Sequence, residues 1–186
     1  MESTAPSPRE REQRFRDVYD AVYADLLRFV RRRVHPSHAE DVVGDVMLVA
    51  WRRLDDLPVD LSAARAWLFG VARKTVQNSR RGDERHGAVA VRLAEARPAD
   101  AGRHPDLVAH RLDIAAAWPL LSASHQEAIA LSALDGLSAP EAAVVLGISS
   151  TAFRLRLSRA RRTLRRHVDA VAGRLPGDPV SERSPR

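Results

Sequence analysis

A basic stretch near the carboxyl end of the chain constrains its fold most. Residues 153–166 hold seven arginines and no acidic residue. Apolar residues recur within and just beyond this stretch at steps of three or four positions, namely Phe153, Leu157, Ala160, Leu164 and Val168. This spacing predicts a helix that buries one face and presents arginines on the other. A rigid row of cations suits a polyanion such as nucleic acid, although an ordinary solvated basic face has the same composition.

The residues before this helix predict a helix-turn-helix. Ser138 and Glu141 have the spacing of a capping box, which starts a short helix. Gly147 suits a left-handed cap at the end of that helix, and Ser149 or Ser150 can cap the next one. The arginine-rich helix then takes the recognition position, where its first turns face base edges and its later turns face phosphates. The candidate DNA-binding residues here are Thr151, Arg154, Leu155, Ser158, Arg159 and Arg162.

Composition excludes several classes of protein. The chain has 186 residues, a formal net charge of +6 and no cysteine, so disulfides, thiol nucleophiles and cysteine-ligated zinc are excluded. His35 and His38 flank a proline and do not indicate a metal site. With no glycine-rich phosphate loop or catalytic triad, we expect neither enzymatic activity nor a cofactor. Neither a membrane-spanning run nor a signal peptide is evident, which predicts a cytoplasmic protein with no membrane insertion.

Charge is distributed unevenly along the chain. From Asp113 to Phe153 inclusive there are four acidic residues and no lysine or arginine, and the arginine-rich stretch follows directly. This asymmetry is typical of a protein that presents a basic surface to DNA and a different surface to a protein.

Helical periodicity dominates throughout and predicts an all-α fold of two small helical bundles joined by a flexible linker. Helices are expected at about 11–34, 37–54 and 63–81, the second one capped by Ser37 with Glu40, and they form a bundle over 11–85. Glycine, proline and small residues predict the linker over 86–106. A second bundle is expected over 107–172, with helices near 107–118 and 124–134 before the helix-turn-helix. Residues 1–10 and 173–186 are expected to be disordered.

The expected second helix separates a broad apolar side from a narrow outward stripe. The stripe consists of Asp41, Asp45, Leu48 and Arg52, spaced by four, three and four residues. A solvated helix face is one explanation of this pattern. The apolar Leu48 between charged residues favours a protein-docking surface instead.

The expected third helix gathers positive charge, amide side chains and an aromatic ring. Its candidate DNA-binding residues are Trp67, Arg73, Lys74, Gln77, Asn78 and Arg81. Cations suit phosphates, amides suit base edges and a ring suits stacking, which is the combination that single-stranded or melted DNA needs. A position in the core is the alternative for Trp67.

Taken in order, these motifs resemble the extracytoplasmic-function (ECF) sigma factors of bacterial RNA polymerase. The resemblance spans about Phe15 to Val168. The residues that match motifs of the family's first domain, region two, are 39–41, 50–52 and 67–73, and those that match its last domain, region four, are 147–149 and 158–161. The chain departs from the family pattern at Gln126, where arginine is usual, and at Leu155, where a small polar residue is usual.

The resemblance implies a dissociable polymerase subunit without catalysis of its own. Its partners would be core RNA polymerase and promoter DNA, and an anti-sigma protein commonly holds such factors inactive. Region two would dock on the polymerase clamp through the stripe of the second helix and open the start-proximal promoter element with the third. Region four would sit on the polymerase flap and read the start-distal element as duplex.

Two other functions stay open from the sequence. An independent helix-turn-helix transcription regulator would bind duplex DNA without polymerase, and would need a ligand pocket or a dimer interface within residues 10–85. A protein-only adaptor built from sigma-like helices would show no dependence on Arg154 or Arg73.

Overall fold

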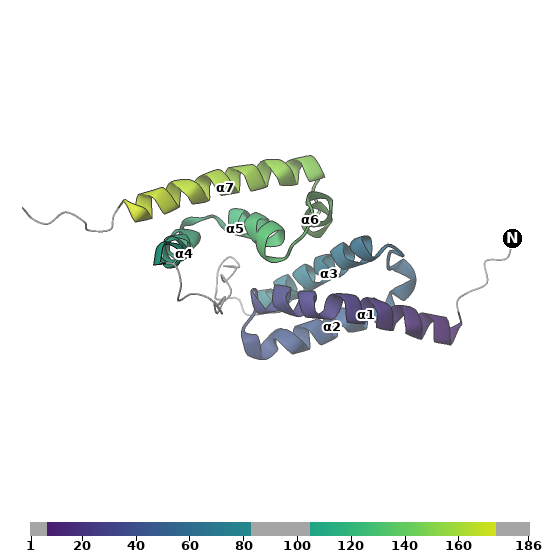
Figure 1. Ribbon diagram of the computed structural model, residues 1–186. Coiled ribbons are helices and arrows are strands. Elements are labelled where there is room, and N and C mark those ends of the chain that lie inside the picture. Colours follow the sequence, from purple (N-terminus) through teal and green to yellow (C-terminus); the bar gives the residue numbers. More distant parts are fainter. Residues whose placement is uncertain (1–6, 83–104, 174–186) are drawn as a thin grey trace, which may run out of the picture.

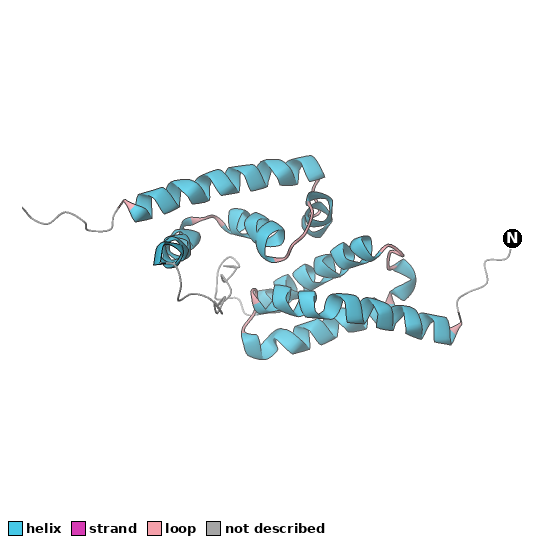
Figure 2. Ribbon diagram, viewed as in Figure 1, coloured by secondary structure: helices cyan, strands magenta, loops and turns pink. Residues whose placement is uncertain are grey.

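The computed structural model describes the backbone of residues 7–82 and 105–173, and the described part is helices joined by short turns, without strands (Figures 1 and 2). The all-α prediction is therefore confirmed. The α-helices are α1 (Pro8–Arg31), α2 (Ala39–Arg52), α3 (Leu61–Gly82), α4 (Pro105–Ala117), α5 (Ala123–Ile129), α6 (Ala139–Leu146) and α7 (Ser150–Ala172). We call α1–α3 the N-terminal bundle and α4–α7 the C-terminal bundle.

Helix α1 begins earlier than the sequence analysis expected. The Ser7 hydroxyl accepts a hydrogen bond from the Glu10 N–H at 3.3 Å, and the Glu10 carboxylate accepts one from the Ser7 N–H at 2.6 Å. This capping box, with Pro8 in the first turn, starts the helix. The prediction of disorder over 1–10 is therefore wrong for residues 7–10, and residues 1–6 lie outside the described part.

The capping box expected at the start of α2 does not form. A short 3-10 turn over Pro36–His38 comes first, and α2 begins after it at Ala39 without a side-chain cap. Ser37 lies inside this turn, so it cannot act as the N-cap. Glu40 instead forms an ion pair with Arg31, at 3.2 Å.

The helix-turn-helix forms as predicted. The Ser138 N–H donates to the Glu141 carboxylate at 2.7 Å, which completes the capping box of α6. Gly147 ends α6 at φ +66°, a left-handed conformation that costs glycine least. The Ser149 hydroxyl then accepts from the Ala152 N–H at 3.1 Å and starts α7.

The two bundles share a core, which the sequence analysis did not anticipate. In the N-terminal bundle, the rings of Phe29 and Phe69 meet edge to face with centroids 4.8 Å apart. Leu131 and Phe153 of the C-terminal bundle belong to the same buried cluster. Figure 1 shows α3 beside α6 where the bundles meet. A second cluster, around Trp118, fills the C-terminal bundle itself.

The expected linker and tail fall mostly outside the described residues. Pro105 and Asp106, which the sequence analysis assigned to the linker of residues 86–106, instead begin α4. Of the expected tail, residues 173–186, only Gly173 is described, and it caps α7.

Candidate functional site

The α2 stripe lies on the surface, with all four of its residues exposed. Leu48 is 45% exposed, whereas Val46 and Met47 beside it in sequence are buried in the core. Trp51, 41% exposed, extends the apolar part of this surface and packs edge-on against Phe15 with ring centroids 5.3 Å apart. The stripe is therefore an apolar centre flanked by charges, a form that suits protein docking.

Most of the candidate DNA-binding residues of α3 share one side of the helix. Lys74 and Asn78 are exposed, and Gln77 is half-buried. Trp67 is half-buried against the core, and the Arg53 guanidinium lies 5.7 Å from its ring centroid. Trp67 thus combines the core position and the surface position that the sequence left as alternatives. Arg81 lies in α3, but its side chain is outside the described part.

Arg73 is held by a carboxylate of the other bundle. Its Nε donates to Oε1 of Glu127 in α5 at 2.7 Å, and its Nη2 donates to Oε2 at 3.3 Å. With its amide oxygen turned toward Arg73, Gln77 also accepts from this guanidinium, at 3.2 Å. Arg73 is therefore engaged within the protein.

A groove of about 400 Å³ runs between α3 and α6. Lys74 and Asn78 line it from α3, while Val144 and Leu146 line it from α6. The groove thus has a polar, cationic wall and an apolar wall, and each bundle supplies one of them.

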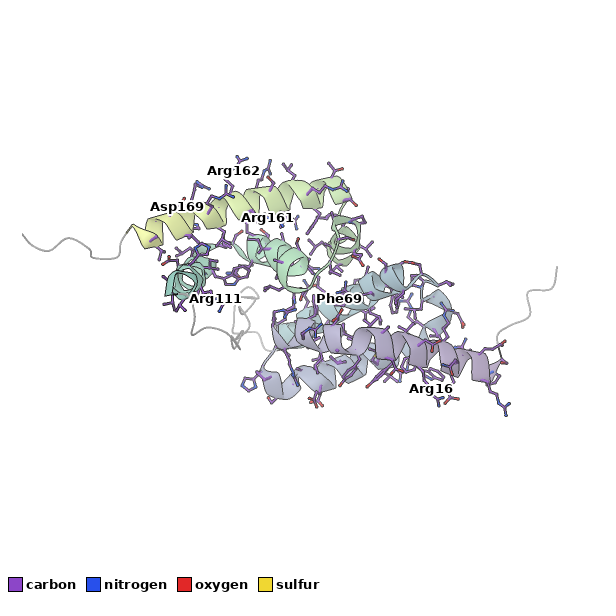
Figure 3. The ribbon with its side chains drawn as sticks, in the orientation of Figure 1. Arg16, Phe69, Arg111, Arg161, Arg162 and Asp169 are labelled. Atoms are coloured by element: carbon purple, nitrogen blue, oxygen red, sulfur yellow. The ribbon has the colours of Figure 1, made fainter. Side chains whose placement is uncertain are left out.

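The recognition face of α7 is uncovered. All six of its candidate residues are exposed, including Leu155 at 50%, while Phe153 and Ala160 on the opposite face are buried. Within the described residues, the arginines of this face, Arg154, Arg159 and Arg162, have no ion-pair partner. Figure 3 shows Arg162 on the outer side of α7 and Arg161 on the side toward α5, where Arg161 donates to Ser132 Oγ at 3.5 Å.

Three acidic residues of the C-terminal bundle face the N-terminal bundle. None of them was expected to do so from the sequence, which indicated Glu141 only as a helix cap. Glu127 meets Arg73, Asp135 meets two arginines directly after α1, and Glu141 meets Arg65 of α3 at 3.8 Å. All three come from the stretch of residues 113–153 that has no lysine or arginine. The uneven distribution of charge was the sequence signal for these three residues. It indicated a surface that faces a protein, but it did not indicate that the protein is the N-terminal bundle of the same chain.

The hydrogen bonds of Glu141 perturb its titration. Burial by itself raises the pKa of its carboxyl group, but hydrogen bonds from Ser138 and Ser62, with the charge of Arg65, outweigh that and lower the pKa below its ordinary value. The Ser62 hydroxyl of α3 donates to this carboxylate at 2.8 Å, so Glu141 both caps α6 and joins α6 to α3.

Gln126, where the family usually has arginine, is buried. It is 4% exposed, and its amide nitrogen donates to the carbonyl oxygen of Trp118 at 3.0 Å. It therefore fixes the turn before α5 and does not present a side chain to DNA.

Two further features of the described residues bear on function. No group of three or more histidines or acidic residues among them is arranged to hold a metal ion. None of the helices in the described ranges has both the length and the apolar character needed to span a membrane.

Two family models match the chain, one in each bundle. The model of sigma-70 region 2 matches residues 18–86, which include most of α1 and all of α2 and α3. The model of sigma-70 region 4 matches residues 111–164, which include α5, α6 and most of α7.

Curated proteins and solved structures agree with these matches. The chain is 35% identical over 154 residues to the ECF RNA polymerase sigma factor SigL of Mycobacterium tuberculosis, covering 81% of this chain and 86% of SigL. It is 35% identical over 146 residues to the RNA polymerase sigma factor CnrH of Cupriavidus metallidurans, covering 72% and 75% of the two chains.

Among solved structures, CnrH in complex with the cytosolic domain of CnrY aligns with a TM-score of 0.58 and 27% identity, covering 86% of this chain and 90% of CnrH. The sigma factor RpoE in complex with the anti-sigma factor NepR, from Bartonella quintana, aligns with a TM-score of 0.55 and 26% identity, covering 85% and 96%.

Proposed function

The chain belongs to the ECF sigma factors, which bind core RNA polymerase and direct it to specific promoters, and we propose that three of its surfaces divide this work. The stripe of α2 binds the core enzyme, α3 takes the start-proximal promoter element, and the recognition face of α7 reads the start-distal element. The N-terminal bundle is region two and the C-terminal bundle is region four.

The exposed recognition face of α7 is the observation that carries this proposal. A recognition helix enters the major groove by its N-terminal end, so Thr151, Arg154, Leu155 and Ser158 come nearest the base edges. Arginine bonds best to guanine, and a leucine contacts a thymine methyl group. Arg159 and Arg162 lie farther along the helix, where phosphates are the nearer partners.

Helix α3 supplies the groups that an unpaired strand needs. Lys74 provides charge for a phosphate and Asn78 provides an amide for a base edge, and both are exposed. Trp67 lies on the same side of α3 and is only half-buried, so part of this aromatic side chain stays accessible for stacking. Arg73 and Gln77 join them once Arg73 is released from Glu127, and Arg81 extends the row by its place in α3.

The stripe of α2 provides the contact with the core enzyme. Its apolar centre at Leu48 excludes water, while Asp41, Asp45 and Arg52 fix the orientation of the partner. No catalytic step is assigned to the chain, because the polymerase holds the chemistry.

We extend two further properties from the relatives to this chain. RpoE was solved in complex with an anti-sigma factor, and we propose a partner of that class here. We also propose that the protein acts in the cytoplasm, where the polymerase is.

Run-off transcription tests the function as a whole. Core polymerase with this protein should initiate from a subset of genomic promoter fragments that core polymerase alone does not use. An independent regulator would instead bind duplex DNA unaided and leave promoter choice by the core enzyme unchanged, and that outcome would reject the proposal.

The docking surface is tested by Asp45→Arg combined with Leu48→Asp. Both side chains are exposed, so helicity should be kept while co-purification with the core enzyme is lost. Asp20→Arg on the exposed side of α1 is the matched control and should still co-purify. Retained binding by the double variant would remove the stripe from the proposal.

A further inference from the structure

Helix α6 lies against the face of α3 that we assign to promoter DNA. A Cβ atom added to Gly70 would lie 4.0 Å from the Cα of Val145, so the two helices approach closely there. Gly70 is one helical turn from both Trp67 and Lys74, on the same side of α3. Promoter DNA and α6 therefore compete for this face.

Glu127 binds the guanidinium group of Arg73 in the way that a phosphate would. Its two carboxylate oxygens take Nε and Nη2 of Arg73, an edge of the guanidinium group that also matches two oxygens of a phosphate. The two side chains are only 20% and 25% exposed, which strengthens the contact relative to a fully solvated pair. Arg73 cannot hold Glu127 and a DNA phosphate along the same edge at once.

Asp135 makes the most deeply buried contact between the bundles. Its carboxylate accepts hydrogen bonds from Arg32 and, at 2.9 Å, from Arg33. The side chains of Asp135, Arg33 and Arg32 are 0%, 2% and 9% exposed. The Arg33 guanidinium also lies 3.6 Å from the ring centroid of Phe29, and Arg65 donates to the carbonyl oxygen of Asp135 at 2.7 Å.

A π turn places Asp135 in this position. The five residues Ala130–Leu134 continue α5 as a π-helix, and the Asp135 N–H donates to the carbonyl oxygen of Ala130 at 2.8 Å. π turns are rare and often mark functional positions, because the extra residue redirects the side chains that follow. Here the side chain that follows the turn meets Arg32 and Arg33, directly after α1.

We propose that the free protein is closed by a carboxylate latch, Glu127 and Asp135 of region four on Arg73, Arg32 and Arg33 of region two, and that the latch must open before α3 can take DNA. The proposal rests on the function proposed above for α3. The carboxylates stand in for phosphates at Arg73 and hold α6 along one wall of the groove that Lys74 and Asn78 line.

The buried charges suit a contact that opens as a unit. A buried ion pair gains little net free energy over separated and solvated charges, whereas losing one partner leaves the others buried without compensation. Arg32, Arg33 and Asp135 carry one more positive than negative charge. Separation of the bundles returns all three to water together, so the contact is specific without being permanent.

The α2 stripe stays outside the latch. Asp41, Asp45, Leu48 and Arg52 are exposed in the closed protein. The core enzyme can therefore reach the stripe while the latch is closed.

The test measures the separation of the bundles and the binding of DNA in the full chain. Because the chain has no cysteine, Ala21→Cys in α1 and Ala170→Cys in α7, both exposed, accept a fluorophore pair without competing sites. Energy transfer between the fluorophores reports closure in the absence of DNA and polymerase. A fluorescent single-stranded oligonucleotide of random sequence, binding to the same protein, reports access to α3.

Glu127→Gln and Asp135→Asn should each lower energy transfer and raise affinity for the oligonucleotide. Each removes charge-assisted hydrogen bonds at nearly constant shape, so the expected gain is about tenfold for Asp135→Asn and smaller for Glu127→Gln. Asp169→Asn in α7 is the matched control: it removes one negative charge from an exposed position of region four and should change neither readout.

Two results would overturn the proposal. One is unchanged energy transfer in Glu127→Gln and in a folded Asp135→Asn protein. Another is that the latch variants show lowered energy transfer but bind the oligonucleotide no more tightly than Asp169→Asn does. Opening would then not expose α3. If Asp135→Asn fails to fold, Glu127→Gln decides alone, because its pair is only partly buried and its loss leaves the core intact.

Failure of the latch and failure of the proposed function are separable. Energy transfer needs neither promoter nor polymerase, so opening can be seen even if run-off transcription shows no promoter choice. Conversely, the protein could show promoter choice in run-off transcription while the latch variants show unchanged energy transfer. That result would reject the latch and leave the proposed function standing.

Discussion

Helices α3 and α7 are both rich in candidate DNA-binding side chains, but they differ in whether carboxylates of the same chain pair with their arginines. The arginines of the α7 recognition face have no carboxylate partner among the described residues, whereas Arg73 of α3 is bound to Glu127. Helix α6 packs against α3 beside this pair, and Val144 of α6, on the groove between the two helices, is 60% exposed. The arginines of a basic helix are therefore available to DNA phosphates only where no carboxylate of the same chain is paired with them.

The largest expected effect on DNA reading is at Arg154. Arg154→Ala should relax preference at one or two base pairs of the start-distal element, at a cost of roughly 1–3 kcal/mol for the preferred sequence. Because this face is already uncovered, the change in preference should be the same for free protein and for holoenzyme. Selection from a promoter library measures it. Unchanged base preference would remove Arg154 from the recognition face.

Substitutions in α3 should behave differently. Lys74→Ala, Gln77→Ala and Asn78→Ala should each weaken open-complex formation by about tenfold, since contacts to unpaired bases are worth roughly 1–3 kcal/mol. Binding to the core enzyme should not change. Permanganate footprinting of promoter thymines reports the melting. Normal melting in all three variants would show that these α3 side chains do not contact the melted promoter strand.

A smaller and uniform effect is expected at Arg162. Replacing this phosphate-facing arginine by alanine should weaken binding to all sequences alike and reduce the slope of log affinity against log salt by about one unit. Titrations at several salt concentrations measure the slope. A change confined to one sequence would place Arg162 among the base-reading residues instead.

The smallest effect concerns Glu141, which joins α6 to α3. Glu141→Gln keeps a capping side chain but removes a charge at the helix N-terminus, so the folded protein should lose about 0.3–1 kcal/mol. The pKa of Glu141 is lowered in the folded state, so this stabilisation is complete above its ordinary value of 4.5 and is lost as the pH falls through the lowered pKa.

Thermal unfolding at neutral pH and near pH 3 checks this. The wild-type protein and Glu141→Gln should differ at neutral pH and converge in acid. A difference that persists in acid would mean that the charge of Glu141 is not what joins α6 to α3.

The fold was largely readable from the sequence because its helices are strongly periodic and well punctuated. Ser138, Glu141 and Gly147 take the roles that the sequence predicts, and of the two candidate caps Ser149 and Ser150 it is Ser149 that starts α7. The start of α1 was also readable, since Ser7, Pro8 and Glu10 form a capping signal, but its polar composition suggested disorder. The box at Ser37 failed because the proline before it holds a 3-10 turn.

The closed arrangement could not be predicted in this way. Glu127, Asp135 and Glu141 are eight and six residues apart, a spacing that does not keep them on one helix face. They reach one interface only through the π turn and the left-handed turn at Gly136, with φ +65°. The sequence indicated an acidic, protein-facing segment, but its partner is the same chain.

The π turn at Ala130–Leu134 gives this protein a mutational route that substitutions do not offer. A π turn is an α-helix with one inserted residue, so deleting Ser132 should restore the α-helical phase. Residues after such a deletion would keep their direction around the α5 axis, whereas one further residue inserted after the turn would rotate them by about 100°. After that insertion Asp135 would turn away from Arg32 and Arg33, although no side chain of the interface had been altered. A one-residue insertion at this turn, rather than an exchange of charged residues, is therefore a simple genetic route from a closed to an open protein.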